Sequence, residues 1–143
     1  MSDLNYFRIH RLSIRLYDQM AEPVAKRHGL SYMEFVILMA LANNRDIRKA
    51  SDIVERLGIA KSHVSLSLSS LEEKGLIGRK EDEKDKRASV LFVSDSAMEI
   101  IRDGRRAQKK YKETLVQGFS EYEKNEMEEL MKKVETNVRR NLL

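Results

Sequence analysis

Residues 63–70 read HVSLSLSS, and the conformation of this stretch decides the fold. Val64, Leu66 and Leu68 alternate with serines, which is the period-two pattern typical of a half-buried β-strand. The flanking sequences, SDIVERLGIAKS before it and LEEKG after it, have helical patterns instead. A strand would leave LEEK without a role and would follow directly on a helix-stopping turn. We therefore predict a helix that ends with Gly75 as its C-terminal cap.

In the helical interpretation the stretch has one apolar face and one hydroxyl face. Spacings of four and three residues put three aliphatic side chains on one side, those of Val64, Leu68 and Leu71. Leu66 comes out off this core face, and Ser62, Ser65 and Ser69 lie on the opposite side. The segment then has a polar surface that is free to contact a partner.

Apolar periodicity predicts helices elsewhere in the chain as well. They cover residues 4–26, a segment from Ser31 to Asn44, residues 49–57, residues 94–118, and a last segment from Ser120 almost to the C-terminus. Ser31 with Glu34, and Ser120 with Glu123, have the spacing of capping boxes. Between residues 75 and 94, LIGRK and ASVLFV flank EDEKDKR, which predicts a β-hairpin with a charged tip.

Length and composition bound the class of protein. The chain has 143 residues, 41% hydrophobic and 35% charged, with six glycines and one proline. This length fits a single domain or a compact two-lobed subunit, and the composition favours long, exposed helices over a loop-rich or all-β fold. The net charge of +4 gives the protein a mild preference for polyanions. The absence of cysteine excludes disulfides and thiolate metal sites. Without a signal-type or membrane-length apolar run, we expect a cytoplasmic protein that does not enter a membrane.

The predicted order of elements is that of a winged helix-turn-helix: a helix, a tight turn containing Gly58, a second helix and a charged hairpin. The second helix is short and polar enough to lie in a major groove of DNA. Its N-terminal turns present the candidate DNA-binding residues Lys61, Ser62, His63 and Ser65. The hairpin adds basic side chains suited to the DNA backbone or minor groove, namely Arg79, Lys80, Lys84, Lys86 and Arg87.

Residues 51–97 resemble the core of the MarR family of multiple-antibiotic-resistance-type regulators, and the surrounding helices match its layout. The most specific piece is Asp85-Lys86-Arg87. The resemblance implies that Arg87 enters the minor groove while Asp85 holds it. Residues two apart on a strand share a face, and a carboxylate can fix a guanidinium, which agrees with that role. In this chain Leu66 and Ser70 stand where the family often has basic residues.

The resemblance also implies the architecture and the partners. The expected fold is mainly α with a small β-hairpin wing: a winged lobe at residues 31–94, and a helical dimerisation region at 1–30 and 95–143 within a single domain. The expected protein is a homodimeric regulator of a pseudo-palindromic operator in double-stranded DNA, a repressor that a small aromatic or anionic effector releases. Candidate pocket residues are His10, Tyr17, Phe35, Met39 and Tyr111, although core packing explains any one of them as well.

Other functions have less support in the sequence. A winged helix can also act as a protein-interaction module without reading DNA, and this alternative stays open. An enzyme is not expected, because the chain has no glycine-rich phosphate loop and no nucleophile with an identifiable base. His10 and His28 lack companions at metal-ligand spacing, so we expect neither a metal nor another cofactor.

Overall fold

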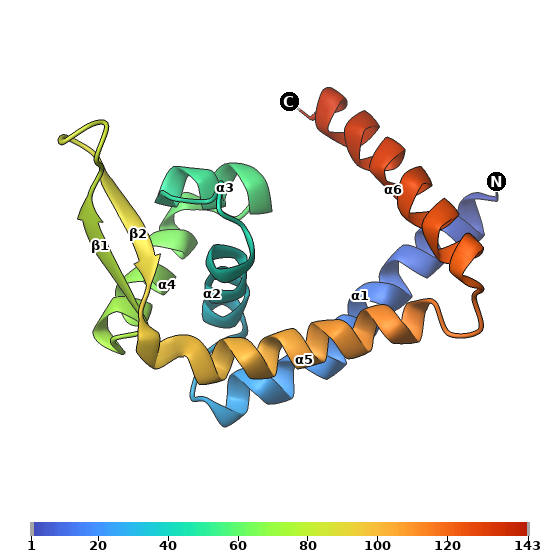
Figure 1. Ribbon diagram of the computed structural model, residues 1–143, viewed down its shortest axis with the longest axis horizontal. Coiled ribbons are helices and arrows are strands. Elements are labelled where there is room, and N and C mark those ends of the chain that lie inside the picture. Colours follow the sequence, from blue (N-terminus) through green and yellow to red (C-terminus); the bar gives the residue numbers. More distant parts are fainter. Residues whose placement is uncertain (1, 143) are drawn as a thin grey trace. The chain divides into compact units, whose positions relative to one another are not determined.

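The computed structural model describes residues 2–142 of the chain. In that range it has six α-helices, a two-stranded sheet and one turn of 3-10 helix at Asp95–Ala97. The bounds are α1 (Asp3–Arg27), α2 (Tyr32–Asn43), α3 (Ala50–Leu57), α4 (Lys61–Glu73), β1 (Ile77–Glu81), β2 (Ser89–Val93), α5 (Met98–Leu115) and α6 (Glu121–Asn141). Figure 1 shows these elements. The described residues form two compact units, one up to residue 109 and one from residue 110 on.

The helix boundaries follow local signals in the sequence. At the start of α2 the Ser31 hydroxyl accepts from the Glu34 amide at 3.1 Å, and the Ser31 amide donates to the Glu34 carboxylate at 3.2 Å. This confirms the predicted capping box, and Ser120 with Glu123 forms the second one before α6. Gly58 ends α3 with a φ of 64°, a left-handed conformation that favours glycine. The expected helix to residue 118 is shorter, since α5 ends at Leu115.

The serine-spaced stretch is helical, as the flanking sequence predicts. Val64, Leu68 and Leu71 in α4 are each 0% exposed, whereas Leu66 is 71% exposed. At the end of α4 the Leu76 amide donates to the Leu71 carbonyl at 3.0 Å, and the Gly75 amide donates to the Glu72 carbonyl at 2.9 Å. These two bonds make a Schellman motif, which stops the helix one turn before the hairpin.

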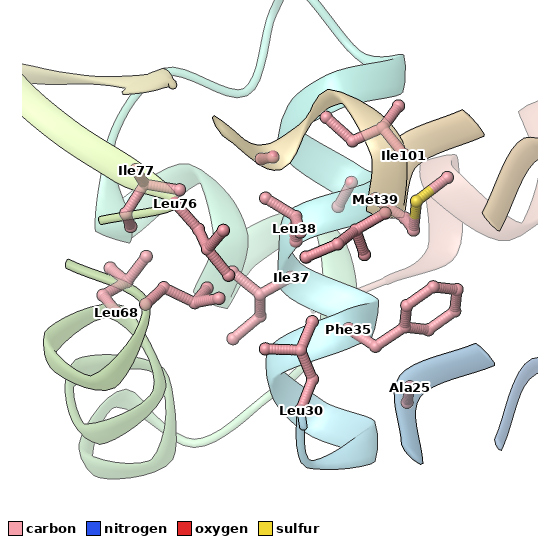
Figure 2. Close-up of a cluster of buried hydrophobic side chains, with 14 of the residues drawn as sticks. Ala25, Leu30, Phe35, Ile37, Leu38, Met39, Leu68, Leu76, Ile77 and Ile101 are labelled. Atoms are coloured by element: carbon pink, nitrogen blue, oxygen red, sulfur yellow. The ribbon is translucent and has the colours of Figure 1, made fainter. Parts of the chain in front are cut away.

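The core of the first unit lies around α2. Figure 2 shows Phe35, Ile37, Leu38 and Met39 on α2, surrounded by side chains from α1, α4, α5 and the hairpin. Gly104 of α5 lies against this helix, because a Cβ atom built there would be 2.5 Å from the Met39 sulfur and 3.1 Å from the Phe35 ring. The helix α2 is therefore the element on which the others pack.

The two strands form the predicted hairpin. They pair antiparallel, with Ile77 opposite Val93 and Gly78 opposite Phe92. The Phe92 ring lies over Gly78, where a Cβ atom would come within 2.3 Å of it. The Leu91 amide donates to the Arg48 carbonyl at 2.8 Å, which ties the hairpin to the segment before α3. In Figure 1 the hairpin extends beside α4 with its tip projecting beyond the helix.

The six helices and the hairpin confirm the predicted fold class, mainly α with a small β-hairpin wing. In the second unit, α6 has no buried residue, and most of its large apolar side chains are exposed. The N-terminal half of α1 likewise exposes several large apolar side chains. No helix among residues 2–142 is long and apolar enough to span a membrane.

A buried carboxylate fixes the C-terminal end of α4 on α2. The Glu34 side chain is only 10% exposed, and its carboxylate accepts from the Lys74 ammonium at 2.7 Å and from the Ser70 hydroxyl at 3.0 Å. Burial alone would raise the pKa of Glu34, but the hydrogen bonds from Lys74, Ser31 and Ser70 outweigh it, so the pKa is lowered below its ordinary value of 4.5.

Two leucines in one helix give a direct check on the packing of α4. We expect Leu68→Ala to lower the free energy of unfolding by about 2–5 kcal/mol, because it leaves a cavity in the core. Leu66→Ala should change it by less than about 0.5 kcal/mol, because the side chain is exposed. Urea denaturation at one fixed protein concentration measures both. Equal losses in the two variants would contradict the helical placement, since a strand would put both side chains on one face.

The Glu34 contacts predict a dependence of stability on pH. Because the pKa of Glu34 is lower in the folded state, its contribution is fully present above pH 4.5 and is lost as the pH falls further, through the folded-state pKa. We expect Glu34→Gln to unfold more easily than the wild type at pH 7, with the difference shrinking toward pH 3. Thermal unfolding across this range is the measurement. The control Glu126→Gln alters an exposed carboxylate on α6 and should leave the wild-type pH profile unchanged.

Candidate nucleic-acid interface

The candidate contact residues of α4 all lie on the surface. Lys61, Ser62, His63 and Ser65 are exposed, as the helical interpretation requires. The N-cap is Ala60, whose side chain cannot accept a hydrogen bond, so the first amides of α4 have no side-chain cap. Uncapped amides together with the helix dipole favour an anion at this end of the helix. The structure thus brings the four predicted residues together beside a positively polarised helix end.

The exposed face of α4 continues from these residues toward the C-terminus. Ser62, Leu66 and Ser69 are spaced by four and three residues, so they lie in one row. All three are exposed, and Leu66 is the only large side chain in this row. Ser70 points elsewhere, because its hydroxyl donates to Glu34 in the first unit's interior. This position therefore contributes to packing.

The tip of the hairpin is organised by Asp82, which the sequence does not single out among the acidic residues of EDEKDKR. Asp82 is 8% exposed, and its carboxylate accepts from the Lys84 amide at 3.1 Å and lies 3.8 Å from the Arg48 guanidinium. Its own amide donates to the Ala88 carbonyl at 3.1 Å. An aspartate that accepts from the amide two residues later is a turn signal. Its burial, however, depends on Arg48 and on the hairpin fold.

The placement predicted for Asp85 and Arg87 needs a correction. The sequence argument put them on one face of a strand, with the carboxylate holding the guanidinium. In the structure both lie in the turn between β1 and β2, and the Asp85 carboxylate accepts from the Arg87 backbone amide at 3.1 Å. Asp85 thus fixes the backbone of the turn. A strand pattern cannot extend through this segment, because the tip closes with two successive aspartate turns.

The cations of the wing differ in their surroundings. Arg79 on β1 donates from its guanidinium to the Glu72 carboxylate at the end of α4, which joins the wing to that helix. Lys86 and Arg87 are exposed, and within residues 2–142 no ion pair engages either side chain. The tip also exposes Glu81, Glu83 and Asp85, so it is not a simple cationic surface, and a role in DNA binding depends on the placement of individual cations. The predicted role of Arg79 in DNA binding stays a prediction.

The structure brings together only part of the predicted effector pocket. Phe35 and Met39 are 0% and 2% exposed and pack in the core beside Gly104. Tyr17 is half-buried on α1, where its hydroxyl accepts from the Gln108 amide group at 3.1 Å. His10 is exposed on α1, and Tyr111 belongs to the second unit. The pocket as a whole stays a prediction.

Comparison with known proteins gives a consistent result. The sequence pattern of the MarR family matches residues 28–88. The chain is 30% identical to the HTH-type transcriptional repressor MdtR of Bacillus subtilis over 110 residues, which are 75% of this chain and 69% of MdtR. It is 34% identical to the HTH-type transcriptional regulator YfiV of the same organism over 73 residues, 51% of this chain. That match spans 45% of YfiV, about half of its length.

Solved structures have the same fold. A MarR family regulator from Listeria monocytogenes, complexed with a 26mer DNA, superposes with a TM-score of 0.79 at 24% identity, covering 96% of this chain and 90% of that one. MarR of Staphylococcus aureus, in complex with salicylate and kanamycin, has a TM-score of 0.77 at 21% identity, covering 96% of this chain and 93% of that one.

The relatives are named as transcriptional regulators and not as enzymes, in agreement with the sequence prediction. The winged helix-turn-helix arrangement of α3, α4, β1 and β2 agrees with the family match as well. The resemblance stated from residues 51–97 is therefore confirmed, and the chain belongs to the MarR family of transcriptional regulators.

Proposed function

We propose that the protein is a sequence-specific DNA-binding regulator that acts as a homodimer on a pseudo-palindromic operator. The observation that carries this proposal is the exposed polar face of α4 next to a wing whose tip cations, Lys86 and Arg87, form no ion pair with another described residue. A helix that is packed on one face and projects polar side chains from the other has the geometry needed to read bases in a major groove. Exposed cations on a hairpin fit the phosphates and the minor groove beside it.

Each part of this surface has a distinct role in the proposed complex. The exposed face of α4 contacts base edges and phosphates through Lys61, Ser62, His63 and Ser65. Arg87 and Lys86 reach the DNA backbone or minor groove from the wing. Asp85 fixes the turn that carries Arg87 by accepting from its backbone amide at 3.1 Å. The division follows from chemistry, since a rigid helix face gives register and cations add affinity without requiring a sequence.

The proposed dimer rests on exposed apolar surface in both units. The first half of α1 exposes a set of large apolar side chains, those of Tyr6, Phe7, Ile9, Leu12 and Ile14. A second set lies along α6, formed by Leu130, Met131, Val134 and Val138. Each set is exposed apolar surface of the kind that a partner buries. A second copy of the chain would bury it and would present two α4 helices to successive major grooves, about 34–36 Å apart.

We propose repression, and its release by a small molecule, by analogy with the relatives. MdtR is named as a repressor, and the Staphylococcus aureus MarR structure holds salicylate. In this chain the proposed effector is a small aromatic or anionic molecule, and His10, Tyr17, Phe35, Met39 and Tyr111 are the proposed pocket residues. The half-buried Tyr17 hydroxyl, bonded to Gln108, is a polar group near the apolar core that such a ligand could engage.

Selection of bound sequences from random double-stranded DNA tests the function as a whole. We expect enrichment of a palindrome whose half-sites are separated by about one helical turn, roughly 10 base pairs. The spacing tests the dimer and the readout together. Failure to enrich any sequence at low salt would contradict the proposal, and it would favour a winged-helix module that binds other proteins.

The role of Arg87 predicts a salt-dependent loss of affinity. We expect Arg87→Ala to weaken operator binding by about 1–3 kcal/mol and to reduce the slope of log affinity against log salt by about 1. Fluorescence anisotropy titrations over a series of salt concentrations measure both. The control Arg140→Ala removes the same charge from an exposed position on α6 and should bind as the wild type does. If Arg87→Ala binds like the wild type at every salt concentration, Arg87 does not contact DNA.

A further inference from the structure

Leu66 is an exception on the exposed face of α4. Its side chain is 71% exposed, the largest exposure of any large apolar side chain in residues 31–97, where Leu57 and Phe92 follow at 37% and 40%. Single exposed leucines are common and need no explanation by themselves. The position of Leu66 is what gives it meaning, because it lies four residues after Ser62 and three before Ser69 on the face turned away from the core.

The surroundings of Leu66 leave it free to act as an apolar contact. Its neighbours along the exposed row, Ser62 and Ser69, have side chains too short to cover it. It does not pack against the buried cluster around α2. It is also separate in sequence from the exposed apolar positions of α1 and α6 that the proposed dimer would bury.

We infer that Leu66 reads the C5 methyl group of a thymine in each half-site of the operator. The inference rests on the proposed DNA-binding function, which turns this face of α4 toward the major groove. In that groove the base edges present hydrogen-bonding groups and one apolar group, the thymine methyl. A leucine side chain cannot pair with the polar groups, so a methyl contact is the favourable one available to it. Leu66 therefore specifies an A·T pair at one fixed position.

The serines beside it strengthen the discrimination. Ser62 and Ser65 carry small hydroxyls that can donate or accept at neighbouring base edges. Because they are short, the backbone of α4 can approach the bases closely enough for the Leu66 side chain to reach a methyl group. A cytosine at the same position would present an amino donor to the leucine without offering it an apolar partner. The operator half-site is expected to contain an invariant thymine flanked by less restricted positions.

Uracil substitution isolates this contact. In the operator found by selection, each thymine of a half-site and its symmetry mate are replaced in turn by deoxyuridine, which removes only the C5 methyl group. We expect one thymine position at which the wild type loses about fourfold in affinity per half-site, the loss that corresponds to one methyl group. Leu66→Ala should bind thymine and uracil operators equally. Ser69→Ala, on the same face, should keep the full uracil penalty.

The outcomes separate the inference from the function on which it rests. If the wild type binds its operator but tolerates uracil at every position, or if Leu66→Ala keeps the penalty, the thymine contact is refuted while DNA binding stands. If neither protein binds any DNA, the proposed function fails. If Leu66→Ala leaves DNA binding intact and instead lowers the molecular mass in sedimentation, Leu66 contacts a protein partner and the inference is overturned.

Discussion

The row formed by Val64, Leu68 and Leu71, buried against α2, determines how α4 is oriented. Burying each of these side chains is worth about 1.5–3 kcal/mol, and together they are comparable with the whole stability of a typical domain. A rotation of α4 by about half a turn, roughly two residues, would bring Leu66 inward and expose this row, so the packing selects one rotation. The hydroxyl face and the wing acquire fixed positions as a result. Every contact proposed for Lys61, Ser62, His63 and Ser65 depends on that selection.

The same packing leaves the outer face of α4 without a structural role, so its residues can be chosen for binding. Ser62, Ser65, Leu66 and Ser69 add little to the stability of the fold, because they are exposed. Stability and recognition thus occupy opposite sides of a thirteen-residue helix. Ser70 is on the boundary between them, since its hydroxyl is bonded to Glu34. Its departure from the family's frequent basic residue is therefore connected with packing inside this chain.

The helices and the hairpin could be predicted because their signals are local: a 3.6-residue period, two capping boxes, and glycines after α1, α3 and α4. The four contact residues of α4 followed from the position of its first turn. The arrangement of the wing tip could not be predicted in the same way. Asp82 is buried because Arg48, far away in sequence, lies beside it, and Asp85 bonds to a backbone amide where a guanidinium was expected. The contact between Glu34 and Lys74 could not be predicted either, because the two residues are far apart in sequence and follow no periodic pattern.

Lys74 joins the corner between α1 and α2 to the C-terminal end of α4. Its ammonium donates to the Gly29 carbonyl, at 3.0 Å, and to the Glu34 carboxylate, at 2.7 Å. Gly29 follows the end of α1, Glu34 begins α2, and Lys74 caps α4. A displacement of the α1–α2 corner must therefore either break two hydrogen bonds to one ammonium group or tilt α4 with it. One side chain therefore holds the corner between α1 and α2 against the C-terminal end of α4.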